Sequence, residues 1–380
     1  MSNFVNAEVT WKNFLNNKIL DYGSKRNYDY GPDKDSSVSK ISPYVSHRVL
    51  IEFELIKEVL AKYNTPQINK FIEELYWRLY WKGWLEFSPC VWDRFKSTKN
   101  QDFDYEDYKK AISGETNLSF FNSWINELVE NNYLHNHTRM WFASTWIFQL
   151  GLPWELGARL FFKHLFDGDA ASNLLSWRWV AGLHTKGKKY FFTAENLEKF
   201  SNRRYKTDSI ENKNINLEDN FDVVLSEEIF SSDMNQKSQD LLLFENDLNV
   251  KTLKNISDRY QNIYLILLDN EDREIKLSQK VLNFKRNLVL EFINIFPKIK
   301  FISSYDFRAR FNDINKFDLI YPCIGDNYDF IKRFQLNYKT NIYNLVREAD
   351  LYCWQFAKKG FYKFNGNIPE INKLIQNIDL

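Results

Sequence analysis

The sequence has few of the residues that build disulfide frameworks or metal centres. Its 380 residues include three cysteines and five histidines. Cys90, Cys323 and Cys353 have neither paired nor metal-ligand spacing, which excludes a disulfide scaffold and fits a reducing compartment. His135 and His137 have no cysteine or carboxylate at ligand spacing, so we expect them to pack or to form hydrogen bonds. No metal site is predicted.

Long apolar runs and an excess of one charge are also missing. No run approaches the length of a membrane span, and the N-terminus lacks a basic head followed by an apolar stretch. We therefore expect a soluble, cytoplasmic monomer without a membrane partner. The net charge of +1 gives the whole chain no general affinity for polyanions. A chain of this length exceeds the usual size of one domain and predicts two.

Aromatic side chains, in contrast, are plentiful: 12 Trp, 21 Tyr and 32 Phe. They gather between His135 and Trp179 with little charge among them. Asn173 and Trp177 are four residues apart, so they share one face of a helix. The triplet Asp167-Gly168-Asp169 supplies a turn and a carboxylate near the first helical turn. A ring-rich helical core suits a stacked planar cofactor, but it equally suits an ordinary buried pair of amphipathic helices.

Hydrophobic periodicity divides the chain into a helical part and a mixed part. Residues 1–205 have helical patterns near 6–20, 51–62, 66–86, 117–132, 135–150, 154–166 and 170–182, with polar segments at 21–39 and 92–112. Residues 206–235 are rich in Asn, Asp and Lys and are interpreted as a linker with little to bury. Residues 236–380 alternate strand-like runs, at 240–244, 262–268, 299–303 and 317–322, with helical patterns. This alternation predicts an α/β domain with a parallel sheet.

Two segments of the helical part are suited to bases or phosphates. Glu74, Trp77 and Arg78 fall on one arc of the helix at 66–86, and an indole beside hydrogen-bonding groups is what a flipped-out base requires. A solvent-facing Glu–Arg pair beside a core tryptophan would give the same pattern. The loop that ends at residues 39–42 carries serine donors suited to phosphate, although a plain turn before a helix also fits it.

The best nucleic-acid patch lies between Arg178 and Lys206. It contains eight Lys or Arg, two Asp or Glu, and interleaved aromatic residues. Binding through these charges would weaken steeply with salt. From charge alone, a solvated surface loop is at least as good an interpretation.

A longer motif is formed by Asn136, Arg139, Met140, Trp154, Asp167, Gly168, Asp169, Asn173 and Trp177. This motif resembles the flavin-binding core of the DNA photolyase and cryptochrome family, and the resemblance extends over residues 20–200. It implies that residues 1–205 form a mostly α-helical domain that holds FAD. The α/β domain at 236–380 would be a permuted counterpart of the family's antenna domain, which normally comes first. The antenna chromophore, if any, is unknown.

The resemblance implies a role for each matching residue. The FAD pyrophosphate would be held by Tyr22, Ser39, Lys40, Ile41 and Ser42, although Val38 stands where the family usually has Thr or Ser. Arg139 and Asp167 would pair beside the isoalloxazine ring, Asp169 would lie near the ribose, and Asn173 would face flavin N5. The damaged DNA would be contacted by Arg26, Glu74, Trp77, Arg78, Asn136 and Met140.

The implied activity is light-driven repair of cyclobutane pyrimidine dimers, in which reduced FAD donates an electron to the dimer. Met140 favours this substrate over the other main photoproduct. Trp177 and Trp154 match the inner two of the family's three electron-transfer tryptophans. The third has no match, and Trp92, Phe103 and Tyr105 are candidate substitutes. A cryptochrome-type blue-light receptor without repair activity is the alternative, and the preferred DNA form is left open.

Overall fold

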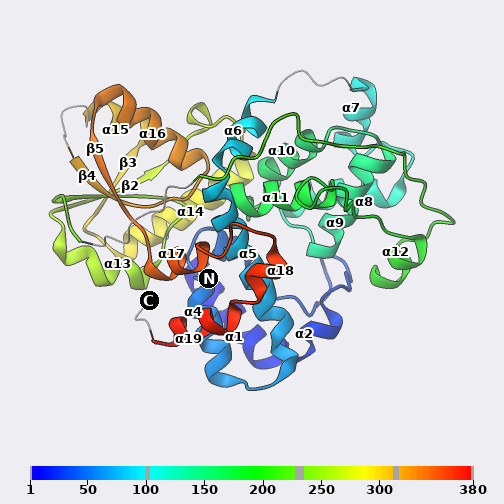
Figure 1. Ribbon diagram of the computed structural model, residues 1–380, viewed down its shortest axis with the longest axis horizontal. Coiled ribbons are helices and arrows are strands. Elements are labelled where there is room, and N and C mark those ends of the chain that lie inside the picture. Colours follow the sequence, from blue (N-terminus) through cyan, green and yellow to red (C-terminus); the bar gives the residue numbers. More distant parts are fainter. Residues whose placement is uncertain (1, 99–102, 227–234, 311–315, 378–380) are drawn as a thin grey trace.

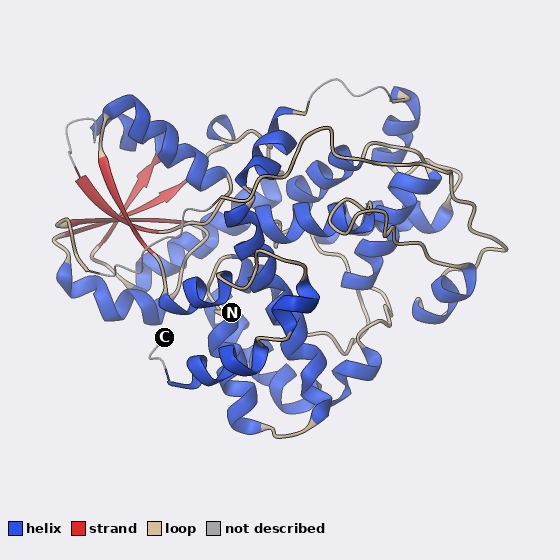
Figure 2. Cartoon of the chain, viewed as in Figure 1, coloured by secondary structure: helices blue, strands red, loops and turns tan. Residues whose placement is uncertain are grey.

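The computed structural model describes residues 2–98, 103–226, 235–310 and 316–377. A helical part and a flanked sheet lie side by side (Figure 1), and the strands belong to one sheet at one end of the molecule (Figure 2). The predicted fold class, a helical domain followed by an α/β domain with a parallel sheet, is confirmed. Within the described ranges, every helix is too short or too polar to cross a lipid bilayer.

The helical part is built from twelve α-helices and a π-helical segment. They are α1 (Asn3–Asn17), α2 (Ile19–Lys25), α3 (Ser42–Ser46), α4 (Glu52–Lys62), α5 (Asn69–Phe87), α6 (Pro89–Ser97), α7 (Tyr105–Ser113), α8 (Ser119–Asn131), α9 (Asn136–Ser144), the π-helix Thr145–Gln149, α10 (Trp154–His164), α11 (Ala170–Val180) and α12 (Ala194–Phe200). The polar segment at 92–112 is more helical than predicted. Pro89 starts α6, and the Asp104 carboxylate caps α7 by accepting from the Glu106 and Asp107 amides.

The sheet has five parallel strands in the order β3-β2-β1-β4-β5. The strands are β1 (Asp240–Phe244), β2 (Asn262–Leu267), β3 (Ile299–Ser303), β4 (Lys316–Ile320) and β5 (Asn341–Leu345). The sequence predicted the first four and missed β5, because this edge strand alternates exposed and partly buried residues and lacks a continuous apolar run.

Helices cover both faces of the sheet. Alternate strand residues point to opposite sides, so Leu241 and Leu243 pack on one face and Leu242 and Phe244 on the other. The first face is covered by α13 (Val250–Ile256) and α14 (Gln279–Ile295), and α1 also contributes there. The second is covered by α15 (Ser304–Arg310) and α16 (Asp326–Tyr338). Burial on both faces explains why β1 and β2 are continuous apolar runs.

Two segments pack differently from the prediction. The described part of the linker, residues 206–226, is not solvated throughout: Ile215, Leu217 and Phe221 pack half-buried on the helical core. The chain also leaves the sheet after β5 and returns to the helical part as α17 (Glu348–Trp354), α18 (Phe361–Asn365) and α19 (Ile368–Asn377) (Figure 1). The sequence places these last helices within residues 236–380 and leaves open whether they pack on the sheet or on the helical domain; they complete the helical core.

The contact between α5 and α17 depends on a glycine. A Cβ added at Gly83 would lie 2.7 Å from Cδ1 of Trp354 and 2.8 Å from Cβ of Ala357. Both neighbours are buried, so neither can move away easily. The returning segment is therefore fitted closely to the central helix of the helical part.

Gly83→Ala should destabilise the protein by roughly 1–3 kcal/mol, because it overpacks this contact. Urea unfolding followed by circular dichroism would measure the loss. Gly360→Ala is the matched control, since nothing lies within 4 Å of its added Cβ. Equal stability of the two variants would contradict the close fit of α17 against α5.

Candidate flavin site

A cavity of about 620 Å³ lies among α5, α9, α11 and the loop before α3. The predicted site residues that line it are Tyr22, Arg26, Ser39, Lys40, Ser42, Glu74, Trp77, Arg78, Asn136, Arg139, Met140, Asp167, Asn173 and Trp177. Residues up to 155 positions apart in the chain therefore meet at one site. Three predicted residues do not line it: Ile41 is in the core, and Asp169 and Trp154 line two other cavities.

Other lining residues were not predicted. They include Trp81, Tyr133, His137, Ser172, Trp179, Tyr190, Asn196 and Phe200. Trp81 could have been found, because it lies one helical turn after Trp77 and so shares its face of α5. Tyr190, Asn196 and Phe200 follow α11 in a segment whose path the sequence did not predict.

A bidentate ion pair joins α9 to the loop before α11. The two terminal nitrogens of Arg139 donate to the two carboxylate oxygens of Asp167 at 3.0 and 2.9 Å. Burial alone would raise the pKa of Asp167, but the charge and hydrogen bonds of Arg139 hold it below its usual value. The pair was expected beside a flavin ring, and the structure brings its two members together at the cavity.

The Trp177 ring forms a wall of the cavity and lies against a glycine. A Cβ at Gly157 would be 2.3 Å from Cη2 of Trp177, so only glycine allows α10 and α11 to approach this closely. The indole Nε1 of Trp177 is buried without a hydrogen-bond partner. On the same face, the Asn173 amide nitrogen donates to the Ala158 carbonyl at 2.9 Å, which leaves the amide oxygen to accept from a ligand.

Glu74 and Trp77 line the cavity from α5. Burial raises the pKa of Glu74 above its usual value, and Arg26, 3.8 Å away, opposes this rise. A protonated Glu74 can donate a hydrogen bond to a ligand. Phe361 of α18 covers Trp77, with ring centroids 3.6 Å apart and 11° between the planes. A bound ring can therefore stack only on the face of Trp77 that Phe361 leaves open.

Arg78 and Asp169 do not lie as expected. Arg78, predicted to contact DNA, points inward: its Nη2 donates to Ser46 Oγ at 3.1 Å and to Asp169 Oδ2 at 3.2 Å. Its Nε also approaches Glu52 at 3.4 Å. Asp169, which the resemblance places near the flavin and ribose, does not line the cavity. Its carboxylate caps α11 by accepting from the Ser172 amide at 2.8 Å, which confirms the carboxylate expected from the Asp167-Gly168-Asp169 triplet at the first helical turn. These buried charges pair with one another rather than with a ligand. They therefore hold in place the helices that form the cavity wall.

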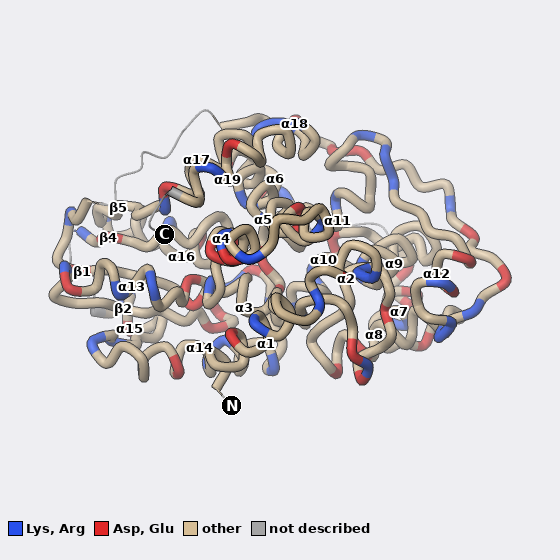
Figure 3. Tube along the Cα trace, turned by 90° about the horizontal axis from the view of Figure 1, so that it is seen from below, with Lys and Arg blue, Asp and Glu red and all other residues tan. Residues whose placement is uncertain are grey.

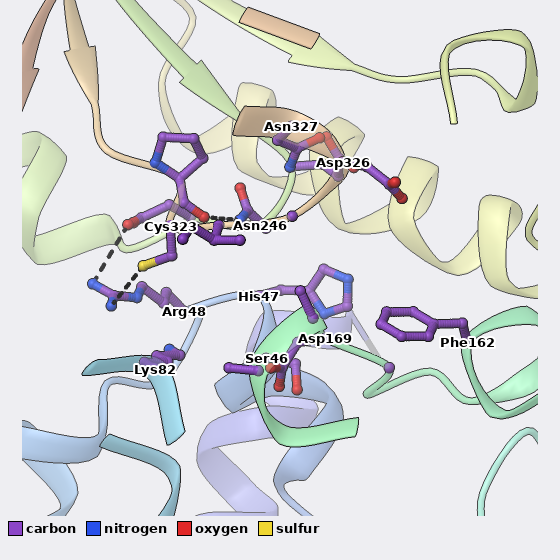
Figure 4. Close-up of a pocket in the computed structure, with 18 of the residues that line it drawn as sticks. Ser46, His47, Arg48, Lys82, Phe162, Asp169, Asn246, Cys323, Asp326 and Asn327 are labelled. Carbon is purple, nitrogen blue, oxygen red and sulfur yellow. Dashed lines mark hydrogen bonds and ion pairs between the residues drawn. The ribbon is translucent and has the colours of Figure 1, made fainter. Parts of the chain in front are cut away.

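A second, smaller cavity of about 90 Å³ lies at the carboxyl ends of β1 and β4, where the strand order reverses (Figure 4). Open α/β sheets commonly bind ligands at this position. Here, charged side chains from both parts fill much of the crevice. Arg48 reaches in from the helical part and pairs with Asp350 at 2.7 Å, and Arg273 pairs with Glu245 at 2.5 Å. The crevice is small compared with pockets for flavin-sized molecules, which are roughly 300–1,000 Å³.

The larger cavity fits a planar, polar cofactor. Its volume lies in the range of small-molecule pockets, and aromatic rings form much of its wall. Two groups at the wall, Trp177 Nε1 and Ser172 Oγ, are buried without a partner and could bond a ligand. Within the described ranges, no three His, Cys, Asp or Glu side chains are grouped to hold a metal ion.

Comparison with known proteins also indicates an FAD-binding domain. Residues 71–210 match the family model of the FAD binding domain of DNA photolyase. The chain is 23% identical over 205 residues to the deoxyribodipyrimidine photo-lyase of Vibrio cholerae, covering 50% of this chain and 42% of that protein. It is 27% identical over 194 residues to a cryptochrome DASH of Natronomonas pharaonis, covering 48% and 40%.

Two solved structures match about half of this chain. A class III photolyase from Agrobacterium tumefaciens is 23% identical with a TM-score of 0.46, and the match covers 52% of this chain and 42% of that one. A Synechocystis cryptochrome is 20% identical with the same TM-score, covering 52% and 43%. The chain thus spans less than half the length of the relatives it matches.

Residues 71–210 are thus similar to the FAD binding domain of DNA photolyase, and the relatives of this segment are photolyases and cryptochromes. FAD is the cofactor that this match supports for the helical part.

Arg139→Met should destabilise the protein by roughly 3 kcal/mol and weaken FAD binding, because it leaves Asp167 buried without its partner. Denaturant unfolding and FAD titration would measure the two effects. Arg286→Met is the control, since Arg286 is exposed on α14, and it should change stability by less than about 0.5 kcal/mol. An unchanged FAD affinity in Arg139→Met would place the pair outside the cofactor site.

The cavity histidine His137 should make stability depend on pH. Burial lowers its pKa from 6.5 to about 4, so the unfolded chain takes up a proton first as pH falls. Its contribution to stability is therefore full above pH 6.5 and is lost as pH falls towards 4. His137→Asn should lose less stability than the wild type over this range.

The opposite sign is expected for Glu127. Burial raises its pKa from 4.5 to about 7, so the folded chain holds the proton longer, and stability falls as pH rises through this range. Glu127→Gln should therefore gain stability relative to the wild type between these values. Both predictions are tested by urea unfolding of the wild type, His137→Asn and Glu127→Gln from pH 4.5 to 7.5. The stability difference between variant and wild type should change with pH in opposite directions for the two variants. A change in the same direction would contradict the burial of one of the two groups.

Proposed function

We propose that this chain carries out light-driven, FAD-dependent repair of cyclobutane pyrimidine dimers in DNA. The observation that supports this most is the composition of one cavity. Groups suited to hold a flavin, Arg139 and Asn173, line the same cavity as a pair suited to a flipped-out base, Glu74 and Trp77. A cavity that binds only a cofactor would not require Glu74 and Trp77.

Each residue has a specific task in this proposal. Bound FAD supplies light absorption and one-electron chemistry, and the protein supplies position and electrostatics. The Arg139 guanidinium favours negative charge beside it. The Glu74 carboxyl forms a hydrogen bond with the edge of a pyrimidine base, and Trp77 stacks on the dimer with its open face. Asn136 and Met140 complete the contact with the dimer from α9.

Only part of the predicted basic patch, residues 178–206, would be available to bind DNA. Arg178 and Arg204 are ion-paired with Asp219 and Asp29, so they do not attract phosphate freely. Five basic residues of the patch are exposed and remain available: Lys186, Lys188, Lys199, Arg203 and Lys206. We therefore expect binding to undamaged DNA that weakens as the salt concentration rises.

A blue-light receptor without repair activity is the second candidate. Two observations favour it: Phe361 already covers one face of Trp77, and basic and acidic residues are interspersed along the chain rather than gathered on one face (Figure 3). In this case the open face of Trp77 would have no DNA ligand, and the flavin state would be the output.

Trp77→Ala and Glu74→Ala should each bind FAD normally but lose repair. Loss of base stacking should weaken binding of dimer-containing oligonucleotide by roughly 10- to 100-fold in Trp77→Ala. The measurements are the flavin absorption spectrum, affinity for a dimer-containing oligonucleotide, and dimer loss under blue light.

Tyr362→Ala is the matched control, because Tyr362 is 91% exposed and adjoins Phe361 in the sequence. It should repair like the wild type. A wild-type protein that is fully loaded with FAD, yet repairs neither single- nor double-stranded DNA, would reject the repair activity and favour the receptor.

A further inference from the structure

A line of oxidisable rings leads from the cavity to the molecular surface. Trp177, which lines the cavity, lies 6.5 Å from Trp146 between ring centroids. Trp146 lies 6.0 Å from Tyr108, and Tyr108 lies 6.3 Å from Tyr105. Tyr105 is 61% exposed. The four rings come from α11, the π-helix and α7, so only the fold brings them together.

The environments of Trp146 and Tyr105 suit a path that ends in a neutral tyrosyl radical at the surface. Trp146 is fully buried and its indole N–H donates to the Pro153 carbonyl at 2.8 Å, which stabilises positive charge but cannot remove the proton. The π-helix adds a residue to the turn that carries Trp146, a distortion often found at functional sites. At the surface, the Lys109 ammonium lies 5.1 Å from the Tyr105 ring centre. Its charge disfavours a radical cation there and favours loss of the phenolic proton.

The other tryptophan considered from the sequence has a different environment. Within the described part of the chain, the ring neighbour of Trp154 is Phe95, at 5.8 Å and 19°. Phenylalanine is far harder to oxidise than tryptophan or tyrosine, so this contact does not extend the line of oxidisable rings. Tyr105 was one of the candidates for the missing surface residue, and Trp146 and Tyr108 are the links that connect it to the cavity.

We propose that Trp177, Trp146, Tyr108 and Tyr105 form the electron path between the surface and the FAD cavity. Bound FAD would supply the light-excited electron acceptor. Trp177 would give it one electron, and Trp146, Tyr108 and Tyr105 would refill the vacancy in turn. The half-buried Tyr108 would release its phenolic proton to water when it is oxidised and take a proton back when Tyr105 reduces it. Tyr105 releases its phenolic proton to water and becomes a neutral radical. A small thiol in solution then restores Tyr105 by giving it one electron and one proton. The path depends on FAD binding and is independent of DNA repair.

The test uses the full chain loaded with FAD, without DNA. After a blue flash, transient absorption of the wild type should show a long-lived tyrosyl radical. Tyr108→Phe should lose this signal and keep an oxidised tryptophan that recombines quickly. Steady reduction of FAD by blue light and thiol should become roughly tenfold slower or more in Tyr108→Phe and in Tyr105→Phe.

Two variants and one binding measurement control this test. Tyr362→Phe removes an exposed tyrosine outside the path and should leave the radical signal intact. Trp154→Phe should also retain it. Titration of each flavin-free variant with FAD should give the wild-type affinity, which shows that the cavity is unchanged.

Retention of both the tyrosyl signal and the photoreduction rate in Tyr108→Phe would overturn the path. Loss of both in Trp154→Phe alone would overturn it as well. Absence of dimer repair in a chain that shows the tyrosyl signal would reject the proposed repair function and leave the path supported.

Discussion

Buried charge in this protein is held in a connected set of pairs, and the shape of the flavin cavity depends on it. Arg139 holds the Asp167 carboxylate, and the Asp167 carbonyl accepts from Ser46 Oγ at 3.0 Å. Ser46 also accepts from Arg78, which connects to Asp169 and Glu52. An unpaired charge at this depth would be costly, so α3, α4, α5, α9 and α11 are fixed relative to one another. These ion pairs and hydrogen bonds therefore hold in place the helices that carry the aromatic walls of the cavity.

The α/β part is joined to the helical part by the same type of interaction. Arg48 of the helical part approaches Asp247, and Lys96 pairs with Asp329 near the start of α16. The crevice at the carboxyl ends of β1 and β4, a common ligand position in open sheets, is lined by Arg48 and Asp247 together with the Arg273–Glu245 pair. In this chain, that edge of the sheet serves to join the two parts.

Local patterns in the sequence were sufficient for much of the fold. The α11 face shared by Asn173 and Trp177, the helix that carries Glu74 and Trp77, and four of the five strands all follow from spacing within one element. The resemblance to a flavin-binding family placed Arg139 and Asp167 together correctly. These features depend on residues close in the chain, where periodicity determines direction.

The remaining features depend on packing between distant segments. Arg78 was expected at a DNA surface, but Glu52, Ser46 and Asp169 draw its guanidinium inward. Phe361 carried no local signal for its place on Trp77, since 284 positions separate the two residues. The sequence also left open whether the last helices, α17–α19, pack on the sheet or on the helical part. A sequence pattern specifies which face of an element is apolar but not which distant segment covers it.

The position of Phe361 has a consequence for how the molecule is made. The wall of the flavin cavity that carries Trp77 is finished by a segment synthesised after the whole sheet. While the ribosome is still translating β1–β5, α5 lacks both the Trp354 contact at Gly83 and the ring that covers Trp77. The contacts that cover this side of α5 can therefore form only after the segment through α18 has emerged from the ribosome.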